Sequence, residues 1–333
     1  MRDPEQSAPA VASSPWDSVH VFFHGDHDRL LTEFVAPLVD DLTAEHAIEG
    51  WFFLRYWEGG PHIRLRLLPA SNAAGDLLRT TVTQRAESYL RAHPSDSSWT
   101  DAFYRRTAEF LARQEGMASH FDHLSPNNSV AWIPYEREFH RYGRGSAIEA
   151  VERHFCDSSG LAVDVIRAGT TKPQRLTTCF IAVVLAWLSA PAATDRAPDR
   201  LGPLAAIVPH AEAHFADRYA EQRPQFIDLA GRLEAQARSS VSEPMLEPWW
   251  SSITRLRGDY ERISRTAPDT LPYADRPGST EFEQTTLLPT LDLCAHLFCN
   301  RLGLAMHEET FVRYLAAHAL ADARADVRGG VVT

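Results

Sequence analysis

The sequence has few cysteines and no apolar run long enough to cross a membrane. Its 333 residues include four cysteines, which are too irregularly spaced for a disulfide framework or a four-thiolate zinc site: Cys156, Cys179, Cys294 and Cys299. The longest apolar run, Cys179 to Ala193, contains Ser189 and Pro191 and is shorter than the roughly 20 residues that span a bilayer. We therefore expect no membrane span, and a reducing cytoplasm is the simplest setting.

Basic side chains are also outnumbered, because 33 Lys and Arg stand against 44 Asp and Glu, for a formal net charge of -11 at pH 7. An acidic surface disfavours direct binding of nucleic acid or of an anionic membrane. An anionic ligand would need a local cluster of cations. The N-terminus lacks the apolar stretch of a secretory signal. We expect residues 1–15 to be disordered, 16–321 to form a single domain, and 322–333 to be a flexible tail.

What the sequence does contain is a front rich in strand signals and a back rich in helix signals. Ser18 to Phe23 reads as a first strand. Trp51 to Trp57 and His62 to Leu68 are separated by Glu58-Gly59-Gly60-Pro61, which predicts a hairpin. Val130 to Tyr135 is a later strand. Helices are expected at 26–42, 73–92, 100–114, 147–168, 175–188, 204–237, 248–266, 289–302 and 307–321. The predicted fold is α+β, with an antiparallel sheet in the N-terminal half packed with a mostly helical C-terminal half.

The second strand of the predicted hairpin has one cationic face. Side chains two apart share a face of a strand, so His62, Arg64 and Arg66 lie on one side, while the alternating apolar residues point into the core. This pattern suits the solvated outer face of an antiparallel sheet. It also suits a site for anions, because guanidinium groups hold carboxylates in a two-point manner. The sequence leaves both interpretations open.

A turn after the strand at Val130 to Tyr135 contains a possible ion pair. Glu138 and Arg141 are three apart and share a side if the turn is helical. They form either a weak surface pair or part of a site. Gly143 and Gly145 allow the chain to approach another backbone or a ligand closely.

The penultimate helix contains a histidine that could transfer protons. His296 and Asn300 are four apart, and Gly303 is placed as the C-terminal cap. His296 is either a histidine that satisfies its hydrogen bonds in the core or a group tuned for proton transfer near neutral pH. With Cys294 and Cys299 it makes a poor zinc set, because a spacing of five does not bring both sulfurs to one face. We expect no metal.

Together these elements resemble a known family. Their order is W-F-F-L-R-Y, H-I-R-L-R, Y-E-R-E-x-x-R-Y-G, E-x-x-F-x-D-S and H-x-x-x-N-R-L-G. It is similar to the C-terminal elimination domain of class I lantibiotic dehydratases, which also occurs as a stand-alone protein in thiopeptide pathways. The resemblance runs from about Trp16 to His318. One departure is Arg144, where the family more often has a second glycine.

The resemblance implies a lyase of ribosomal peptide (RiPP) antibiotic biosynthesis. It would eliminate glutamate from glutamylated Ser or Thr and leave dehydroalanine or dehydrobutyrine, without a cofactor. Its partners would be the leader and core of a bacteriocin-type precursor peptide and a separate glutamylating dehydratase subunit, and a homodimer is possible. The implied catalytic residues are Arg64, Arg66, Glu138, Arg141 and His296. The implied substrate-binding residues are Arg55, His62, Tyr142, Asn300 and Arg301.

Two other functions remain open at this point. A pyridine synthase of thiopeptide pathways would share the fold and join two dehydroalanines by a formal cycloaddition, with release of the leader peptide. A non-catalytic protein could instead bind the leader peptide along an exposed strand edge such as Ser18 to Phe23.

Overall fold

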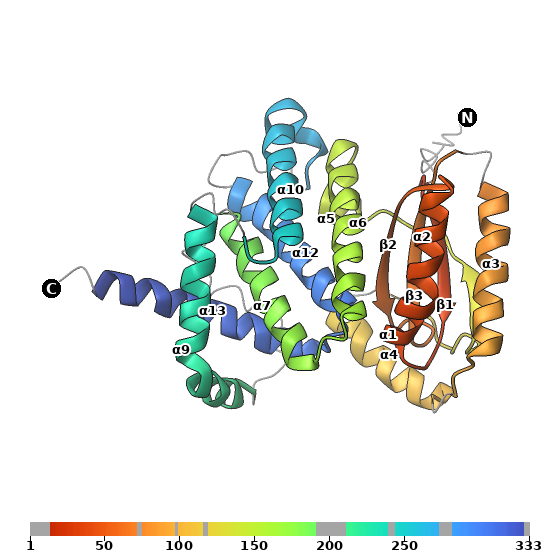
Figure 1. The fold of residues 1–333 in the computed structure, drawn as a ribbon, viewed down its shortest axis with the longest axis horizontal. Helices are drawn as coiled ribbons and strands as arrows, with labels where there is room; N and C mark the ends of the chain where they lie inside the picture. Colours follow the sequence, from red (N-terminus) through yellow and green to blue (C-terminus); the bar gives the residue numbers. More distant parts are fainter. Residues whose placement is uncertain are drawn as a thin grey trace, which may run out of the picture.

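The structure is a computed structural model that describes residues 14–71, 75–96, 99–115, 119–190, 211–238, 244–272 and 282–329. The sheet lies at one end of the molecule and most of the helices lie at the other, with α6 between them (Figure 1). The predicted α+β fold, with an antiparallel sheet in the N-terminal half and a helical C-terminal half, is confirmed.

Four antiparallel strands form the sheet in the order β2-β3-β1-β4. They are β1 (Asp17–Phe22), β2 (Ile48–Tyr56), β3 (His62–Pro69) and β4 (Ser129–Trp132). The predicted hairpin joins β2 to β3, and its turn contains Gly59 and Gly60 with φ values of 78° and 107°. Glycine adopts such positive φ values without steric cost. The proposal that Ser18 to Phe23 offers an exposed edge is wrong, because β1 pairs with β3 on one side and β4 on the other.

One face of the sheet is apolar and belongs to the main core. Val19, Val21, Ile63, Leu65 and Leu67 are fully buried. Two helical segments supply apolar partners of this core. They are the run α1 (His27–Leu30), η1 (Leu31–Val35) and α2 (Ala36–Ala44), with one π-type turn in the middle, and the helix α3 (Gly75–Ala92). Burial of these side chains provides the main driving force for this layer.

The remaining helices are amphipathic or buried, as their periodicity predicts. On α6 the buried residues recur at helical spacing, for example at Ile148, Val151, Phe155 and Ala162. The helices and single turns are α4 (Asp101–Glu115), α5 (Phe139–Tyr142), α6 (Ser146–Arg167), α7 (Lys172–Leu188), α9 (Ala211–Arg238), α10 (Glu247–Thr266), η4 (Pro268–Thr270), η5 (Glu283–Leu287), α12 (Leu288–Arg301) and α13 (Met306–Gly329).

Some expectations concern segments at the borders of the described residues. Helix α13 continues to Gly329, eight residues beyond the predicted end at Ala321, so most of the expected tail is helical. The predicted disordered N-terminus lies outside the described residues up to position 13, as do 330–333, 191–210 and 273–281. Within the described ranges, no helix is both long and apolar enough to cross a membrane.

Candidate functional site

The strand register brings polar side chains from two strands onto the second face of the sheet. His62, Arg64 and Arg66 of β3 form what we call the cationic face, and the register pairs Arg66 with Ser18 and Arg64 with His20 of β1. His62 is 0% exposed and Arg66 is 5% exposed. This face is therefore not the solvated surface that was one of the two interpretations.

Arg66 is a buried cation with unused hydrogen-bond donors. Its Nε and Nη1 have no hydrogen-bond partner, and its Cζ lies 5.2 Å from the centre of the Tyr135 ring. Burial, followed by repulsion from Arg64, lowers the pKa of Arg66 to about 9. A buried charge without a partner is costly, because the charge has lost its water and gained no counter-ion. An anion bound beside Arg66 would compensate this charge.

Arg64 and His62 lie beside Arg66 and are held by neighbours. Arg64 Nη2 donates to Glu58 Oε2 at 3.0 Å, and its Cζ lies 3.4 Å from the centre of the Tyr56 ring. The Nε2 atom of His62 accepts from Arg64 Nε at 3.3 Å, and its Nδ1 binds the carbonyl oxygen of Gly60 at 2.8 Å. Burial lowers the pKa of His62 to about 3, so His62 is neutral near pH 7.

The predicted pair of Glu138 and Arg141 forms and lies near the cationic face. Glu138 Oε1 is 3.2 Å from Arg141 Nη1, and both side chains are partly exposed. The charge of Glu138 acts to raise the pKa of Arg66, so this carboxylate lies within electrostatic range of the cationic face. The preceding Arg137 binds both oxygens of Glu152 on α6, at 2.8 and 2.6 Å, and so fixes the start of this turn.

The end of this turn packs closely against the segment that contains Thr270. Gly143 has a φ of 80°, and a Cβ at this position would overlap the carbonyl oxygen of Thr270. Tyr142 is buried, and its carbonyl oxygen accepts a hydrogen bond from Tyr260 at 2.7 Å. Burial raises the pKa of Tyr142 well above its ordinary value. The close approach expected at Gly143 is confirmed.

Asn300 and Arg301 bind the free edge of β2. Asn300 Nδ2 donates to the carbonyl oxygen of Arg55, and the backbone N–H of Arg55 donates to Asn300 Oδ1, both at 3.0 Å. Arg301 is fully buried and donates from Nε to the carbonyl oxygen of Phe53 at 2.9 Å. Ser159 accepts from the N–H of Phe53 at 3.2 Å. We call this arrangement the β2 clamp, because it joins α12 and α6 to the sheet as a neighbouring strand would.

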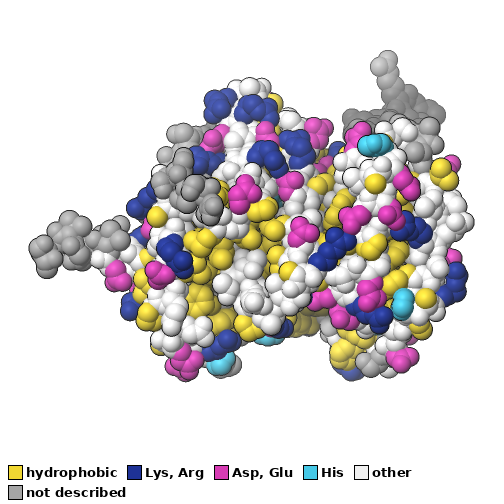
Figure 2. Space-filling view, viewed as in Figure 1, with side chains coloured by type: hydrophobic (Ala, Val, Ile, Leu, Met, Phe, Trp, Pro, Cys, Tyr) yellow, Lys and Arg dark blue, Asp and Glu magenta, His cyan; other side chains and the backbone are white. Residues whose placement is uncertain are grey.

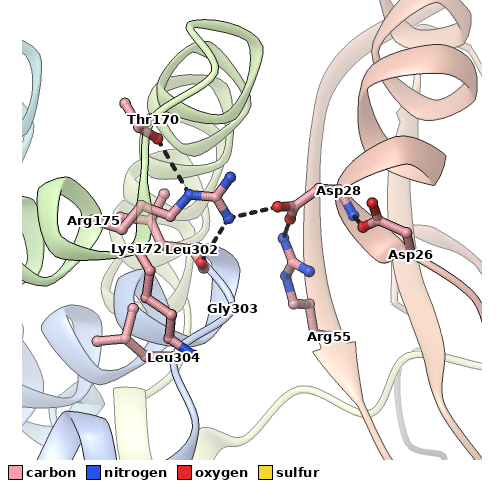
Figure 3. A pocket seen from close by; sticks show the side chains of 9 residues that line it. All are labelled: Asp26, Asp28, Arg55, Thr170, Lys172, Arg175, Leu302, Gly303 and Leu304. Carbon is pink, nitrogen blue, oxygen red and sulfur yellow. Dashed lines mark hydrogen bonds and ion pairs between the residues drawn. The ribbon is translucent and has the colours of Figure 1, made fainter.

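The side chain of Arg55 lies on the opposite face of the sheet from Arg64 and Arg66, because Arg55 pairs with Ile63, which points into the core. It lines a cavity of 350 Å³ between the sheet and the helical half (Figure 3). There Asp28 bridges two guanidinium groups, at 2.5 Å from Arg55 and 2.6 Å from Arg175. Lys172 also lines the cavity and pairs with Glu308 at 2.6 Å. The cations of this cavity thus have resident carboxylate partners, unlike Arg66.

His296 belongs to a third group of charged residues, which we call the His296 network. Its Nδ1 binds Glu309 of α13, at 2.8 Å from Oε2 and 3.0 Å from Oε1. Arg313 donates to Glu309 at 2.9 Å and to Asp292 at 2.5 Å. The ring of His296 is 45% exposed, whereas Glu309 and Arg313 are buried. Burial alone would lower the pKa of His296, but the Glu309 carboxylate outweighs this effect and holds the pKa above its ordinary value.

The structure therefore brings some of the predicted site residues together and separates others. His62, Arg64 and Arg66 share one face of β3, and Glu138, which pairs with Arg141, acts on Arg66 through its charge. Arg55 lies at the opposite face, and Asn300 and Arg301 lie at the edge of β2. Among the described residues, the hydrogen bonds and ion pairs of His296 lead to α13 and none leads to the cationic face.

Sequence reasoning missed the partners of His296 and two residues of β1. The signal for the former was the spacing of four between Glu309 and Arg313 on one helix. The signal for Ser18 and His20 was the same alternation of β1 that identified the strand.

The surface is mixed in charge. Figure 2 shows acidic side chains spread over both halves of this face and basic side chains gathered over the upper end of α10. Within the ranges that the structure describes, no group of three His, Cys, Asp or Glu side chains could hold a metal ion.

Comparison with protein families gives one match across nearly the whole chain. Residues 16–320 match the family described as lantibiotic biosynthesis dehydratase C-term. The chain belongs to this family. The match agrees with the span of the resemblance seen in the motifs. The chain matches none of the curated proteins with which it was compared.

Solved structures with the same fold include two of similar length and one much longer protein. The pyridine synthase TbtD from thiomuracin biosynthesis has 22% identity and a TM-score of 0.71, with 92% of this chain and 98% of that chain covered. TsrL has 16% identity and a TM-score of 0.63, with coverages of 93% and 95%. The tRNA-dependent lantibiotic dehydratase MibB from Microbispora sp. 107891 has 20% identity and a TM-score of 0.57. That comparison covers 97% of this chain but only 29% of MibB.

Proposed function

We propose that this protein eliminates glutamate from glutamylated Ser or Thr residues of a ribosomally made precursor peptide. The observation that carries this proposal is Arg66, a buried guanidinium whose Nε and Nη1 atoms have no hydrogen-bond partner. Its neighbour Arg64 adds positive charge on the same face of the sheet. A leaving glutamate supplies the carboxylate that such a cluster lacks.

The reaction is a β-elimination. A base removes the proton from Cα of the glutamylated residue, and the electron pair passes through an enolate to form the Cα=Cβ double bond. The bond between Cβ and the ester oxygen breaks, and glutamate departs with a carboxylate where the ester was. Guanidinium groups would stabilise the negative charge on the departing group. Glu138, which is paired with Arg141, would orient this arginine rather than act as the base.

His296 is our candidate for proton transfer. Its ring is half-exposed, and one nitrogen is fixed by Glu309, an arrangement that orients an imidazole and tunes it near neutral pH. Helix α12 places it one turn, or about 6 Å along the axis, before the residue that binds β2. In this proposal the precursor peptide contacts both the cationic face and His296 during the reaction.

The glutamylating step would belong to a separate subunit. This chain corresponds to 29% of MibB, a tRNA-dependent dehydratase. The formal net charge of -11 also disfavours direct binding of transfer RNA. We therefore propose that a partner glutamylates the precursor peptide and that this protein acts on the product.

Mass spectrometry of a glutamylated precursor peptide tests the proposal. Incubation with the protein should yield dehydrated peptide and free glutamate. Arg66→Met should slow this by about 100-fold or more, as expected for loss of a charged group that stabilises the transition state. The matched control is Arg85→Met, which removes an exposed arginine paired with Asp41. An unmodified rate in Arg66→Met, or glutamylated peptide that persists with the wild type, contradicts the proposal.

A second test separates the role of His296. His296→Ala should let glutamylated peptide accumulate in the same assay, because the proton transfer would lack its group. Dehydration at the normal rate would remove His296 from the mechanism and leave the cationic face as the site.

The second candidate function is pyridine synthesis. It is favoured by the TM-score of 0.71 to TbtD and by the coverage of 98% of that chain. The test is incubation with a precursor that already contains dehydroalanines. Ring closure with release of the leader peptide would identify a synthase, whereas an unchanged peptide would favour elimination.

A further inference from the structure

Strand β1 presents two polar side chains to the same space as Arg66. Ser18 lies directly opposite Arg66 in the register, and His20 lies opposite Arg64. Side chains of directly opposed residues are neighbours about 5 Å apart on one face of a sheet. The ring of His20 stacks on that of His62, with 4.9 Å between their centres. Ser18, His20 and Arg66 thus present their side chains to the same part of the cationic face, which we call the recess.

All three side chains in the recess are buried and have unused hydrogen-bonding atoms. Ser18, His20 and Arg66 are 4%, 3% and 5% exposed. The atoms without a partner are Ser18 Oγ, His20 Nε2, and Nε and Nη1 of Arg66. Buried polar groups in folded proteins are nearly always hydrogen-bonded. Four unpaired polar atoms on three side chains of neighbouring strand positions therefore indicate a ligand rather than ordinary packing.

The net charge of the three side chains in the recess indicates which kind of ligand would bind there. Arg66 contributes one positive charge, and no carboxylate among the described residues pairs with its guanidinium. His20 is neutral, because burial and the charge of Arg66 lower its pKa to about 2. A neutral imidazole donates one hydrogen bond and a serine hydroxyl donates another. One cation with two neutral donors matches a small monoanion.

We propose that Ser18 and His20 form, together with Arg66, a binding site for a carboxylate of the glutamyl group. The inference rests on the proposed function for the identity of the carboxylate, and it assigns Ser18 and His20 as residues that bind this group. The centre of the Tyr135 ring lies 5.2 Å from the Arg66 guanidinium and the three side chains are buried, so little water would reach a bound anion. Exclusion of water strengthens the hydrogen bonds to it.

Two carboxylates of glutamate could occupy the recess. The α-carboxylate is released from the ester during elimination, and the γ-carboxylate is present throughout. Free L-glutamine contains only the first, and glutamic acid α-amide contains only the second. Comparison of the two with L-glutamate distinguishes the sources.

The experiment measures binding of these three amino acids by saturation-transfer NMR to the full chain. The variants are Ser18→Ala and His20→Phe. Each should weaken binding of L-glutamate about tenfold, since a lost hydrogen bond to a charged group costs about 1.4 kcal/mol. Whichever of the two amides binds like L-glutamate identifies the carboxylate in the recess.

Matched controls make the same chemical changes at other buried positions. Ser189→Ala removes a hydroxyl that donates to the carbonyl oxygen of Leu185, at the C-terminal end of α7. His154→Phe replaces a buried histidine that binds Ser252 at 2.8 Å. Both controls should bind L-glutamate as the wild type does. Unchanged binding in Ser18→Ala and in His20→Phe, each shown to be folded by circular dichroism, overturns the proposal.

A parallel assay keeps this inference separate from the proposed function. If the wild type eliminates glutamate and the two β1 variants do so with unchanged KM, the recess proposal is wrong and the lyase proposal stands. If the wild type binds L-glutamate through the recess but never dehydrates a glutamylated peptide, the lyase proposal fails alone.

Discussion

The His296 network makes a prediction about the charge of a single imidazole. The perturbation is Glu309→Gln, which keeps the shape of the side chain and removes its charge. Because Glu309 is the group that holds the pKa of His296 above its ordinary value, the pKa should fall in the variant. Burial then remains as the dominant influence, and it favours the neutral ring.

The size of the expected stability change follows from the exposure of the His296–Glu309 pair. His296 is 45% exposed, so water screens its attraction to Glu309 to about 0.5–1 kcal/mol. Arg313 also loses a charged partner, but it keeps Asp292. The hydrogen bond from Arg313 to the Glu309 carboxylate becomes a weaker one to a neutral amide. We expect this change to lower the free energy of unfolding by a further ~1 kcal/mol. We expect Glu309→Gln to lower the free energy of unfolding by about 1.5–2 kcal/mol where His296 is charged.

The pH dependence has a definite sign. A raised pKa of His296 means that its charge stabilises the fold below the unfolded pKa, and this contribution is lost as the pH rises through the folded pKa. The pKa of Glu309 is lowered, so this carboxylate stays ionised at pH values below its ordinary pKa. The loss in Glu309→Gln should therefore be about 0.5–1 kcal/mol larger near pH 5.5 than near pH 9.

NMR titration of the His296 ring and urea unfolding at the two pH values measure these effects. The control is Glu308→Gln, which changes the adjacent carboxylate that pairs with Lys172 and should leave the His296 titration unaltered. Equal losses at both pH values, or an unshifted titration of His296 in Glu309→Gln, would refute the electrostatic account.

Two other variants test the cationic face and the turn beside it. Arg66→Met should raise the free energy of unfolding by about 1–3 kcal/mol in urea at neutral pH, because it removes an uncompensated buried charge; a loss of stability would mean that Arg66 is already paired. Gly143→Ala should be less stable than Gly145→Ala by about 1–3 kcal/mol in the same measurement. Both positions have positive φ, but only at Gly143 does a Cβ meet another backbone, so equal losses would contradict the close contact with Thr270.

Local patterns were sufficient to predict the elements of the fold. The alternation in β1 and β3 and the two glycines of the hairpin turn each act over a few residues, and the structure has both strands and the turn. The order of the strands was not predictable in this way. That β1 lies inside the sheet depends on its pairing with β4, more than 100 residues later in the chain.

The candidate site was predictable in part for the same reason. Arg64 and Arg66 share a face because they lie two apart on one strand, and Glu138 meets Arg141 because they lie three apart in one turn. Whether His296 joins them depends on how α12 rotates about its axis, which packing against α13 decides. The spacing of residues in the sequence does not determine that rotation.

The β2 clamp has a consequence for the roles of two predicted site residues. The side chains of Asn300 and Arg301 bind the backbone of Arg55 and Phe53, so they hold α12 to the sheet whatever reaction the site performs. In this chain the pair therefore belongs to the scaffold. The chemistry of this protein is tested instead by the proposed substitutions at Ser18, His20 and Arg66.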